Sequence, residues 1–297
     1  MNMSHLRLLE PAPGILAWYD GRVAGYRTDP APNWVDDGAI AVGIASYAVV
    51  DGDQALVYDT HVSVPHGRRI RADLEARGVR DFTVVLSHWH LDHVAGTEAF
   101  ADCEVIANIR TAAHLEARRE GIEAGTDKGP PAIRPLILPS TTFDSHRALT
   151  VGDRVVELIG ANIHSDDATV IWLPDGGTLL AGDTLEDPAT YVCEPQDFAA
   201  HLADLDRLAA LGARAILPNH GDPVRIAAGG YGPGLIGATQ RYVRWLMALR
   251  DDPARADTPL SQVIRDDLEA GHLVWFQDYE EVHAENVART LAQFRHG

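Results

Sequence analysis

The chain is poor in the features that mark several classes of protein. Its 297 residues include two cysteines, Cys103 and Cys193, and one lysine, Lys128. Two isolated cysteines cannot form a framework of disulfides, and their spacing is not that of a zinc ribbon. The N-terminal residues lack the apolar segment of a secretory signal peptide. No stretch approaches the run of about 18 apolar residues that crosses a membrane. We therefore expect a cytoplasmic protein that does not span a membrane.

Positive charge is scarce as well. Lysine and arginine together number 25 against 43 aspartates and glutamates, which gives a net charge of −18. An acidic surface repels the phosphates of nucleic acids, and basic clusters such as "HGRRIR" are short. We expect a small-molecule substrate and no nucleic-acid partner, while the sequence leaves the oligomeric state open.

What the chain does have is an alternation of strand-like and helix-like segments. Apolar and β-branched runs predict strands at 14–20, 40–52, 54–60, 81–90, 103–108, 154–161, 168–174, 178–183 and 214–222. Amphipathic patterns predict helices at 65–79, 96–102, 108–121, 195–213, 235–250, 259–270 and 279–296. The order predicts an α/β fold, with a catalytic domain over residues 1–232 and a helical extension packed on it over residues 233–297.

Two irregular segments interrupt this pattern. Residues 20–38, which include Tyr26, Pro32 and Trp34, are rich in glycine, proline and aspartate. Residues 119–145 hold several prolines and glycines. Long irregular segments inside a compact domain are often functional. We expect both to border the substrate, with Trp34 either contacting it or packing within its own loop.

Metal-binding side chains gather behind one predicted strand. The stretch "SHWHLDH" supplies four of them: His88, His90, Asp92 and His93. On an extended chain residues 88 and 90 point the same way, so both imidazoles can bind one ion, and a turn after them lets the next two face another position. Later predicted strands end at three more candidates, His164, Asp183 and His220. Catalytic zinc needs three protein ligands and an open position, so this set predicts a metal centre.

Taken in order, these motifs resemble those of the metallo-β-lactamase fold. "HWHLDH" matches the H-x-H-x-D-H signature of that superfamily. "IHSDDATVIW", "LLAGDTL" and "LPNHG" are similar to the segments that carry its third histidine, its bridging aspartate and its last histidine. "ALVYDTH" resembles an early D-T-G element, with His61 in place of the glycine. The resemblance covers about residues 14–225 and implies a four-layer αβ/βα sandwich.

The resemblance also implies how the ligands are shared. His88, His90 and His164 would hold one ion, Asp92, His93 and His220 a second, and Asp183 would bridge the two. The implied cofactors are two divalent ions, zinc by default and iron or manganese as alternatives. Asp59 would orient a metal ligand or the loop that carries the H-x-H-x-D-H motif, or else be a plain turn residue at a strand end. The same two interpretations apply to Thr184.

A hydrolytic mechanism follows from this arrangement. Two cations about 3.5 Å apart would hold a bridging water as hydroxide near neutral pH. The hydroxide would attack a carbonyl carbon while one metal stabilises the oxyanion. Asp92 would be the catalytic residue that orients the nucleophile and takes its proton. His61 would donate a proton to the leaving group, or be a packing residue.

The motifs specify the fold better than the substrate. A small ester, thioester or lactone is the preferred substrate, because Asp183 stands where zinc β-lactamases commonly have cysteine. The alternatives are β-lactam hydrolysis, persulfide oxidation at a single iron, and a binding protein without catalysis. Lactonases often carry a tyrosine three residues after the bridging aspartate, where this chain has Glu186, and Tyr191 follows later. His283 and Asn286 share one face of the last predicted helix and would reach the pocket rim or be helix contacts.

Overall fold

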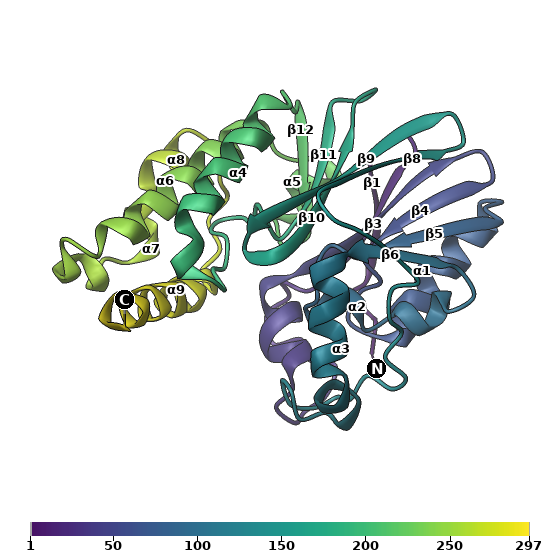
Figure 1. Cartoon of the computed structure of the whole chain (residues 1–297), viewed down its shortest axis with the longest axis horizontal. Helices are drawn as coiled ribbons and strands as arrows, with labels where there is room; N and C mark the ends of the chain where they lie inside the picture. The colour runs from purple at the N-terminus through teal and green to yellow at the C-terminus, as the bar shows by residue number, and fades with distance from the viewer. Residues whose placement is uncertain (1, 297) are drawn as a thin grey trace.

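The computed structural model describes residues 2–296 and contains two β-sheets that lie face to face (Figure 1). The first sheet has the order β1 (Arg7–Ala12), β2 (Ile15–Asp20), β3 (Ile44–Asp51), β4 (Gln54–Tyr58), β5 (Asp81–Val85), β6 (Glu104–Asn108) and β7 (Thr141–Phe143). The second sheet has the order β12 (Ala215–Pro218), β11 (Thr178–Gly182), β10 (Ser165–Leu173), β9 (Arg154–Ile163) and β8 (His146–Val151). Each half of the chain thus builds one sheet.

Helices cover the outer face of each sheet. On the first sheet lie α1 (Val64–Ala76), the short α2 (Leu91–Val94) and α3 (Ile109–Ala124). On the second sheet α4 (Phe198–Ala210) packs against β9, and the short α5 (Pro223–Ala227) follows β12 and contacts β1. The predicted α/β fold and four-layer sandwich are confirmed.

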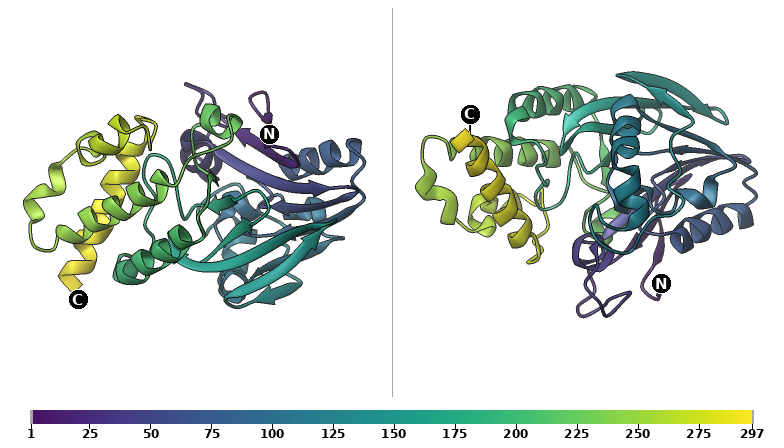
Figure 2. Two further views of the ribbon diagram at one scale, coloured as in Figure 1. Left: turned by 90° about the horizontal axis from the view of Figure 1, so that it is seen from above. Right: turned by 60° about the horizontal axis from the view of Figure 1, so that its bottom comes forward.

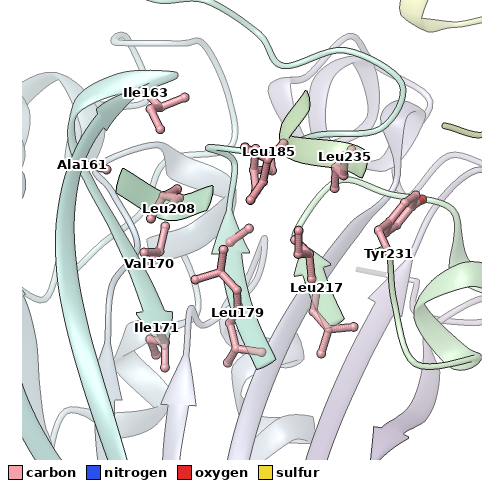
Figure 3. Close-up of a cluster of buried hydrophobic side chains, with 14 of the residues drawn as sticks. Ala161, Ile163, Val170, Ile171, Leu179, Leu185, Leu208, Leu217, Tyr231 and Leu235 are labelled. Atoms are coloured by element: carbon pink, nitrogen blue, oxygen red, sulfur yellow. The ribbon is translucent and has the colours of Figure 1, made fainter. Parts of the chain in front are cut away.

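The strands show why the sandwich is stable. All six residues of β2 are buried, and its side chains alternate between two cores. Ile15 and Tyr19 belong to the core between the sheets, whereas Leu16 and Trp18 belong to the core under α1 and α3. A strand with both faces covered reads as a continuous apolar run, which is the pattern that predicted it. Figure 3 shows part of one apolar cluster around the second sheet, which includes Val170 of β10 and Leu208 of α4.

The C-terminal residues form helices that gather at one end of the molecule (Figure 2). They are α6 (Gly234–Ala248), α7 (Leu260–Val263), α8 (Arg265–Glu269) and α9 (Tyr279–His296). The helix predicted at 259–270 is divided, because Ile264 leaves the helical conformation between α7 and α8. One hydrophobic cluster runs from β11 through α4 into α6 and α9. The division of the chain at residue 232 therefore stays a prediction.

Several boundaries differ from those expected. The strand predicted at 81–90 ends at Val85, so the histidines do not lie on extended chain and the side-chain alternation used to pair them is wrong. Two hydrogen bonds mark the turn: the Leu86 N–H still bonds to the sheet at Ile106, and the Ser87 N–H donates to Asp59 Oδ1 at 2.7 Å. The strand predicted at 40–52 starts at Ile44 because a π-helical turn fills the residues before it.

Three strands had no counterpart in the sequence prediction. β1 is an edge strand in which none of the six residues is buried, and it has a proline near its end. β7 has only three residues, and β8 is the exposed edge of the second sheet. Short or half-exposed edge strands carry a weak apolar signal. In the part of the chain that the structure describes, no helix is long and apolar enough to cross a membrane.

Asp187 is a buried carboxyl whose titration should affect stability. Its side chain is fully buried, accepts hydrogen bonds from Tyr231 Oη at 2.7 Å and from the Val274 N–H at 2.8 Å, and burial raises its pKa to about 6. Because the folded state holds this proton more tightly than the unfolded state, the carboxyl lowers stability progressively as pH rises from about 4 to about 6.

The variant Asp187→Asn lacks this titration. Its stability relative to the wild type should therefore increase over the same pH range, by up to about 3 kcal/mol for a shift of roughly two pKa units. Urea unfolding of both proteins at a series of pH values, with chelator in every sample, measures the difference. A difference that does not change with pH would show that the buried carboxyl does not titrate as inferred.

Candidate metal centre

Seven side chains from the ends of strands meet at one edge of the sandwich. The ligand atoms of His88, His90, His164 and Asp183 all lie within 4.8 Å of one another. The ligand atoms of Asp92, His93 and His220 form a second group by the same measure. The structure thus brings all seven predicted ligands together, with Asp183 in the first group.

The chain reaches this edge through a series of turns. His88 and His90 lie in the bend between β5 and α2, and α2 itself carries the next two members of the motif. His164 sits between β9 and β10 with a φ of 69°, a left-handed conformation that non-glycine residues seldom adopt. Asp183 and His220 follow the buried strands β11 and β12, which lie side by side. Backbone geometry therefore aims these side chains at one place.

The imidazole rings are held by their outer nitrogens. These lie within hydrogen-bond distance of one oxygen each: His88 Nδ1 at 2.9 Å from Ser87 Oγ, His93 Nδ1 at 2.9 Å from Asp59 Oδ2, His164 Nδ1 at 3.0 Å from the Tyr191 carbonyl, and His220 Nδ1 at 2.6 Å from the Gly43 carbonyl. A proton on Nδ1 leaves the lone pair of Nε2 free, and metal-binding histidines commonly use this arrangement. Four rings therefore present Nε2 to the centre.

The inner nitrogens have no adequate protein partners. His90 Nδ1 lies 2.9 Å from His88 Nε2 and 3.0 Å from His164 Nε2, so three lone pairs converge. In the second group His93 Nε2, and beside it Asp183 Oδ1, are buried and without a hydrogen-bond partner. Buried polar atoms without partners are costly, and a cation between them would satisfy them. The donor set, histidine nitrogen with carboxylate oxygen, suits a divalent metal.

Asp183 lies between the two groups. Its Oδ2 atom is 3.5 Å from His88 Nε2 and 3.7 Å from His164 Nε2 in one group, and 3.1 Å from His93 Nε2 and 3.4 Å from His220 Nε2 in the other. Burial alone would raise the pKa of Asp183, but the imidazoles of His220 and His93 hold it well below its usual range. Asp183 is therefore an ionised carboxylate placed where a bridging ligand would be.

Asp92 is one of the two candidate ligands that are not fully buried, with 18% of its side chain exposed. Its Oδ2 atom lies 3.4 Å from both His93 Nε2 and His220 Nε2. Burial raises its pKa, and the neighbouring imidazoles of His93 and His220 lower it well below the usual range. An ionised carboxylate at this position can accept a proton from a group in the cavity.

Asp59 holds in place the loop after β5 that carries His88 and His90, as the sequence suggested. It is fully buried, and its two oxygens accept from the Ser87 N–H at 2.7 Å, from His93 Nδ1 at 2.9 Å and from Asn219 Nδ2 at 2.5 Å. Asn219 was not identified from the sequence, although it directly precedes His220. The hydroxyl of Thr184 donates to the Ala181 carbonyl at 2.7 Å and stabilises the turn after β11.

A cavity of about 820 Å³ opens above these ligands. Both irregular segments line it, and they contact each other: Trp34 Nε1 donates to the Pro131 carbonyl at 3.0 Å, and the Trp34 N–H bonds to Pro130. Buried Asp36 orders the first segment by accepting from the N–H groups of Thr28 and Asp29. The two segments thus form one connected wall, and Trp34 both packs on its neighbour and borders the cavity.

Other candidate residues lie away from the cavity. His61 is fully buried and stacks on His66 with ring centroids 4.4 Å apart, so it is a packing residue and does not line the cavity. His283 Nδ1 lies 2.9 Å from Tyr242 Oη inside the C-terminal helices. Asn286 accepts from the Val192 N–H at 2.8 Å, which ties α9 to the segment after Asp183. Both residues of α9 are helix contacts.

Sequence reasoning missed two neighbours of the ligands on the segment that follows β11. Glu186 lines the cavity, lies 3.4 Å from His164 Nδ1 and accepts from Tyr279 Oη at 3.0 Å. Cys193 places its sulfur 3.7 Å from His90 Nε2. Neither stands at a strand end, so the pattern that found the ligands gave no signal for them.

Comparison with known proteins confirms the resemblance. The model of the metallo-beta-lactamase superfamily matches residues 40–220, which include all seven candidate ligands. The chain belongs to this superfamily. Solved structures agree on the fold: a metallo-beta-lactamase from Pontibacter korlensis has a TM-score of 0.60 at 17% identity, covering 81% of this chain and 99% of that one. VMB-1 has a TM-score of 0.62 at 16% identity, covering 83% and 100%.

Two curated relatives are similar to this chain over part of their length. A linear primary-alkylsulfatase from Pseudomonas sp. is 24% identical over 209 residues, which are 57% of this chain and 40% of that protein. A beta-lactamase-like protein 2 homolog from Caenorhabditis elegans is 25% identical over 138 residues, 46% of this chain and 41% of that protein. The chain spans about two fifths of the length of these two relatives.

Proposed function

We propose that the protein is a metal-dependent hydrolase of a small ester, thioester or lactone, with two divalent ions at the candidate centre. Zinc is the preferred ion. His88, His90 and His164 would hold one ion, Asp92, His93 and His220 the other, and Asp183 would bind both. The position of Asp183 Oδ2 within 3.7 Å of imidazole nitrogens from both groups carries this proposal.

Bound divalent ions supply a water of lowered pKa and Lewis acidity toward a carbonyl oxygen. The protein's own residues supply orientation and a proton acceptor. The ionised carboxylate of Asp92 faces the cavity and would orient the attacking water and accept its proton. The connected wall around Trp34 would hold the substrate and reduce access of bulk water.

A sulfate ester is a second candidate substrate, because a relative found by sequence is a linear primary-alkylsulfatase. β-Lactam hydrolysis remains an alternative that the aspartate at position 183 disfavours, and the structural likeness to metallo-beta-lactamases speaks for the fold only. Persulfide oxidation at a single iron is disfavoured because seven side chains supply two groups of ligand atoms.

A hydrolysis screen on metal-loaded protein tests the proposal. It compares a 4-nitrophenyl ester, an acyl thioester, a lactone, an alkyl sulfate and a chromogenic β-lactam, each with zinc, manganese or iron. Assay of glutathione persulfide oxidation with the iron form covers the last alternative. We expect turnover of an ester, thioester or lactone, and its loss on chelation.

The Asp183→Asn variant, purified in parallel, controls for contaminating hydrolases. Exclusive turnover of the alkyl sulfate or the β-lactam would replace the proposed substrate class. Rates equal to those of the variant for every compound would contradict hydrolysis altogether.

A further inference from the structure

Three basic side chains line the cavity among a larger number of carboxylates. The chain as a whole has 25 basic residues against 43 acidic ones, and its single lysine, Lys128, lines this cavity. Arg118 from α3 and Arg289 from α9 line it as well. In a strongly acidic chain most cations are expected to pair with carboxylates, so these three raise the question of what they bind.

Two of the cations share one aromatic ring beside a metal ligand. The Arg118 guanidinium lies 4.1 Å from the centroid of the Trp89 ring, and Lys128 Nζ lies 5.7 Å from a Trp89 ring centroid. Trp89 in turn lies 4.5 Å from the ring of His90, measured between centroids. The ring therefore holds both positive charges close to the candidate metal centre.

Neither cation is neutralised by the protein. Arg118 Nη1 lies 3.4 Å from His114 Nδ1. The nearby carboxylate of Asp166 is hydrogen-bonded to His114 instead, with 2.7 Å between Oδ1 and Nε2. Among the described residues no carboxylate forms an ion pair with Arg118 or Lys128, and this includes the adjacent Asp127. The third cation, Arg289, lies over the Tyr191 ring at 5.1 Å and belongs to α9, whose carboxylates also line the cavity.

The carboxylates that line the cavity come from several elements, and one group of them lies at α9. Asp278, Glu281 and Glu285 border it at and just before α9, and Tyr191 Oη donates to Glu285 at 3.1 Å. Asp37, Asp127 and Glu194 line other parts of it, so Arg118 and Lys128 around Trp89 are unpaired positive positions in an otherwise acidic cavity. A ligand with one anionic end would be oriented by this difference.

We propose that Arg118 and Lys128 form a subsite for an anionic group of the substrate, such as a carboxylate, distant from the bond that is cleaved. The inference rests on the proposed hydrolase function and narrows its substrate to an acidic acyl compound. Arginine supplies a planar pair of donors and lysine a point charge, both suited to a carboxylate. The two residues orient the substrate, while the metal centre performs the reaction.

Matched pairs of 4-nitrophenyl esters test this substrate class. The half-esters of succinic, glutaric and adipic acid are compared with the butyrate, valerate and hexanoate esters, which have the same chain lengths and leaving group. We expect one half-ester to show a KM about tenfold below that of its neutral partner, since one charge-assisted hydrogen bond is worth that much. A preference for the neutral esters, or for esters of ω-amino acids, would overturn the inference.

Variants assign the preference to the two cations. Arg118→Met and Lys128→Met should each raise the KM of the half-ester toward that of the neutral ester with little change in kcat, and Lys128→Arg should retain the preference. Arg119→Met is the matched control, because Arg119 neighbours Arg118 but pairs with Glu116 and Glu123 at 3.7 Å. A preference that survives both methionine variants would place anion recognition elsewhere.

A binding test separates this inference from the hydrolase function. Because Lys128 is the only lysine, acetylation followed by mass spectrometry reports on one side chain besides the N-terminal amine. Glutarate should slow acetylation of Lys128, and Arg118→Met should weaken that protection while Arg119→Met does not. Protection without ester turnover would support the subsite and contradict the hydrolase; turnover without protection or charge preference would do the reverse.

Discussion

Replacement of Asp183 by asparagine is expected to abolish turnover and to remove bound metal. The carboxylate lies within 3.7 Å of imidazole nitrogens from both ligand groups, so its loss affects both ions at once. The amide is neutral and brings N–H donors toward rings that must themselves offer lone pairs. We expect kcat/KM to fall by at least about 10²–10³-fold, the range for removal of one electrostatic group from an active site.

Metal content measured by inductively coupled plasma mass spectrometry, together with kinetics, checks this result. Asp187→Asn is the matched control, because Asp187 is an equally buried carboxyl four residues further on that makes its hydrogen bonds to Tyr231 and Val274. The control should keep its metal and most of its activity. An Asp183→Asn protein with full metal content and near-normal kinetics would remove the bridging position from the proposal.

The convergence of the candidate ligands could be predicted from the sequence because of their positions at or near strand ends. Asp183 directly follows β11, and His220 lies two residues after the end of β12. Both strands are buried and apolar, and such strands give a clear signal in a sequence. Strand ends on one edge of a sandwich converge, so the types of these residues and their order along the chain were sufficient to predict that their side chains meet. His88 and His90 lie close together, as predicted, but the premise was wrong, since β5 ends at Val85 and a bend, not strand alternation, turns the two rings together.

The surroundings of the ligands could not be predicted in the same way. Arg118 is one of several arginines on an amphipathic helix, and only the packing of α3 beside the motif loop places it over Trp89. Glu186 and Cys193 lie on an irregular segment whose path is set by its contacts with α9. Such contacts join residues far apart in the chain, and a single sequence carries no periodic signal for them.

Replacement of Asp59 by asparagine is expected to weaken metal binding. Oδ2 of Asp59 accepts from His93 Nδ1 at 2.9 Å and from Asn219 Nδ2 at 2.5 Å, so Nδ1 of His93 keeps its proton and Nε2 keeps its lone pair. In Asp59→Asn the new amide N–H would face these two donors and favour the opposite tautomer of His93, with a proton on the nitrogen that should bind metal. We expect affinity for one of the two ions, and activity with it, to fall about 10–100-fold.

The chain offers a matched control for this change. Asp20 and His66 form another fully buried pair, with 3.2 Å between Oδ2 and Nε2, and neither belongs to the groups that could hold metal. Asp20→Asn should therefore lower stability without changing metal stoichiometry. Titration of each metal-free protein with zinc gives the result: two tight sites in Asp20→Asn, and one tight and one weakened site in Asp59→Asn. Equal loss of both sites in Asp59→Asn would mean that Asp59 supports the fold of the whole centre rather than the tautomer of His93.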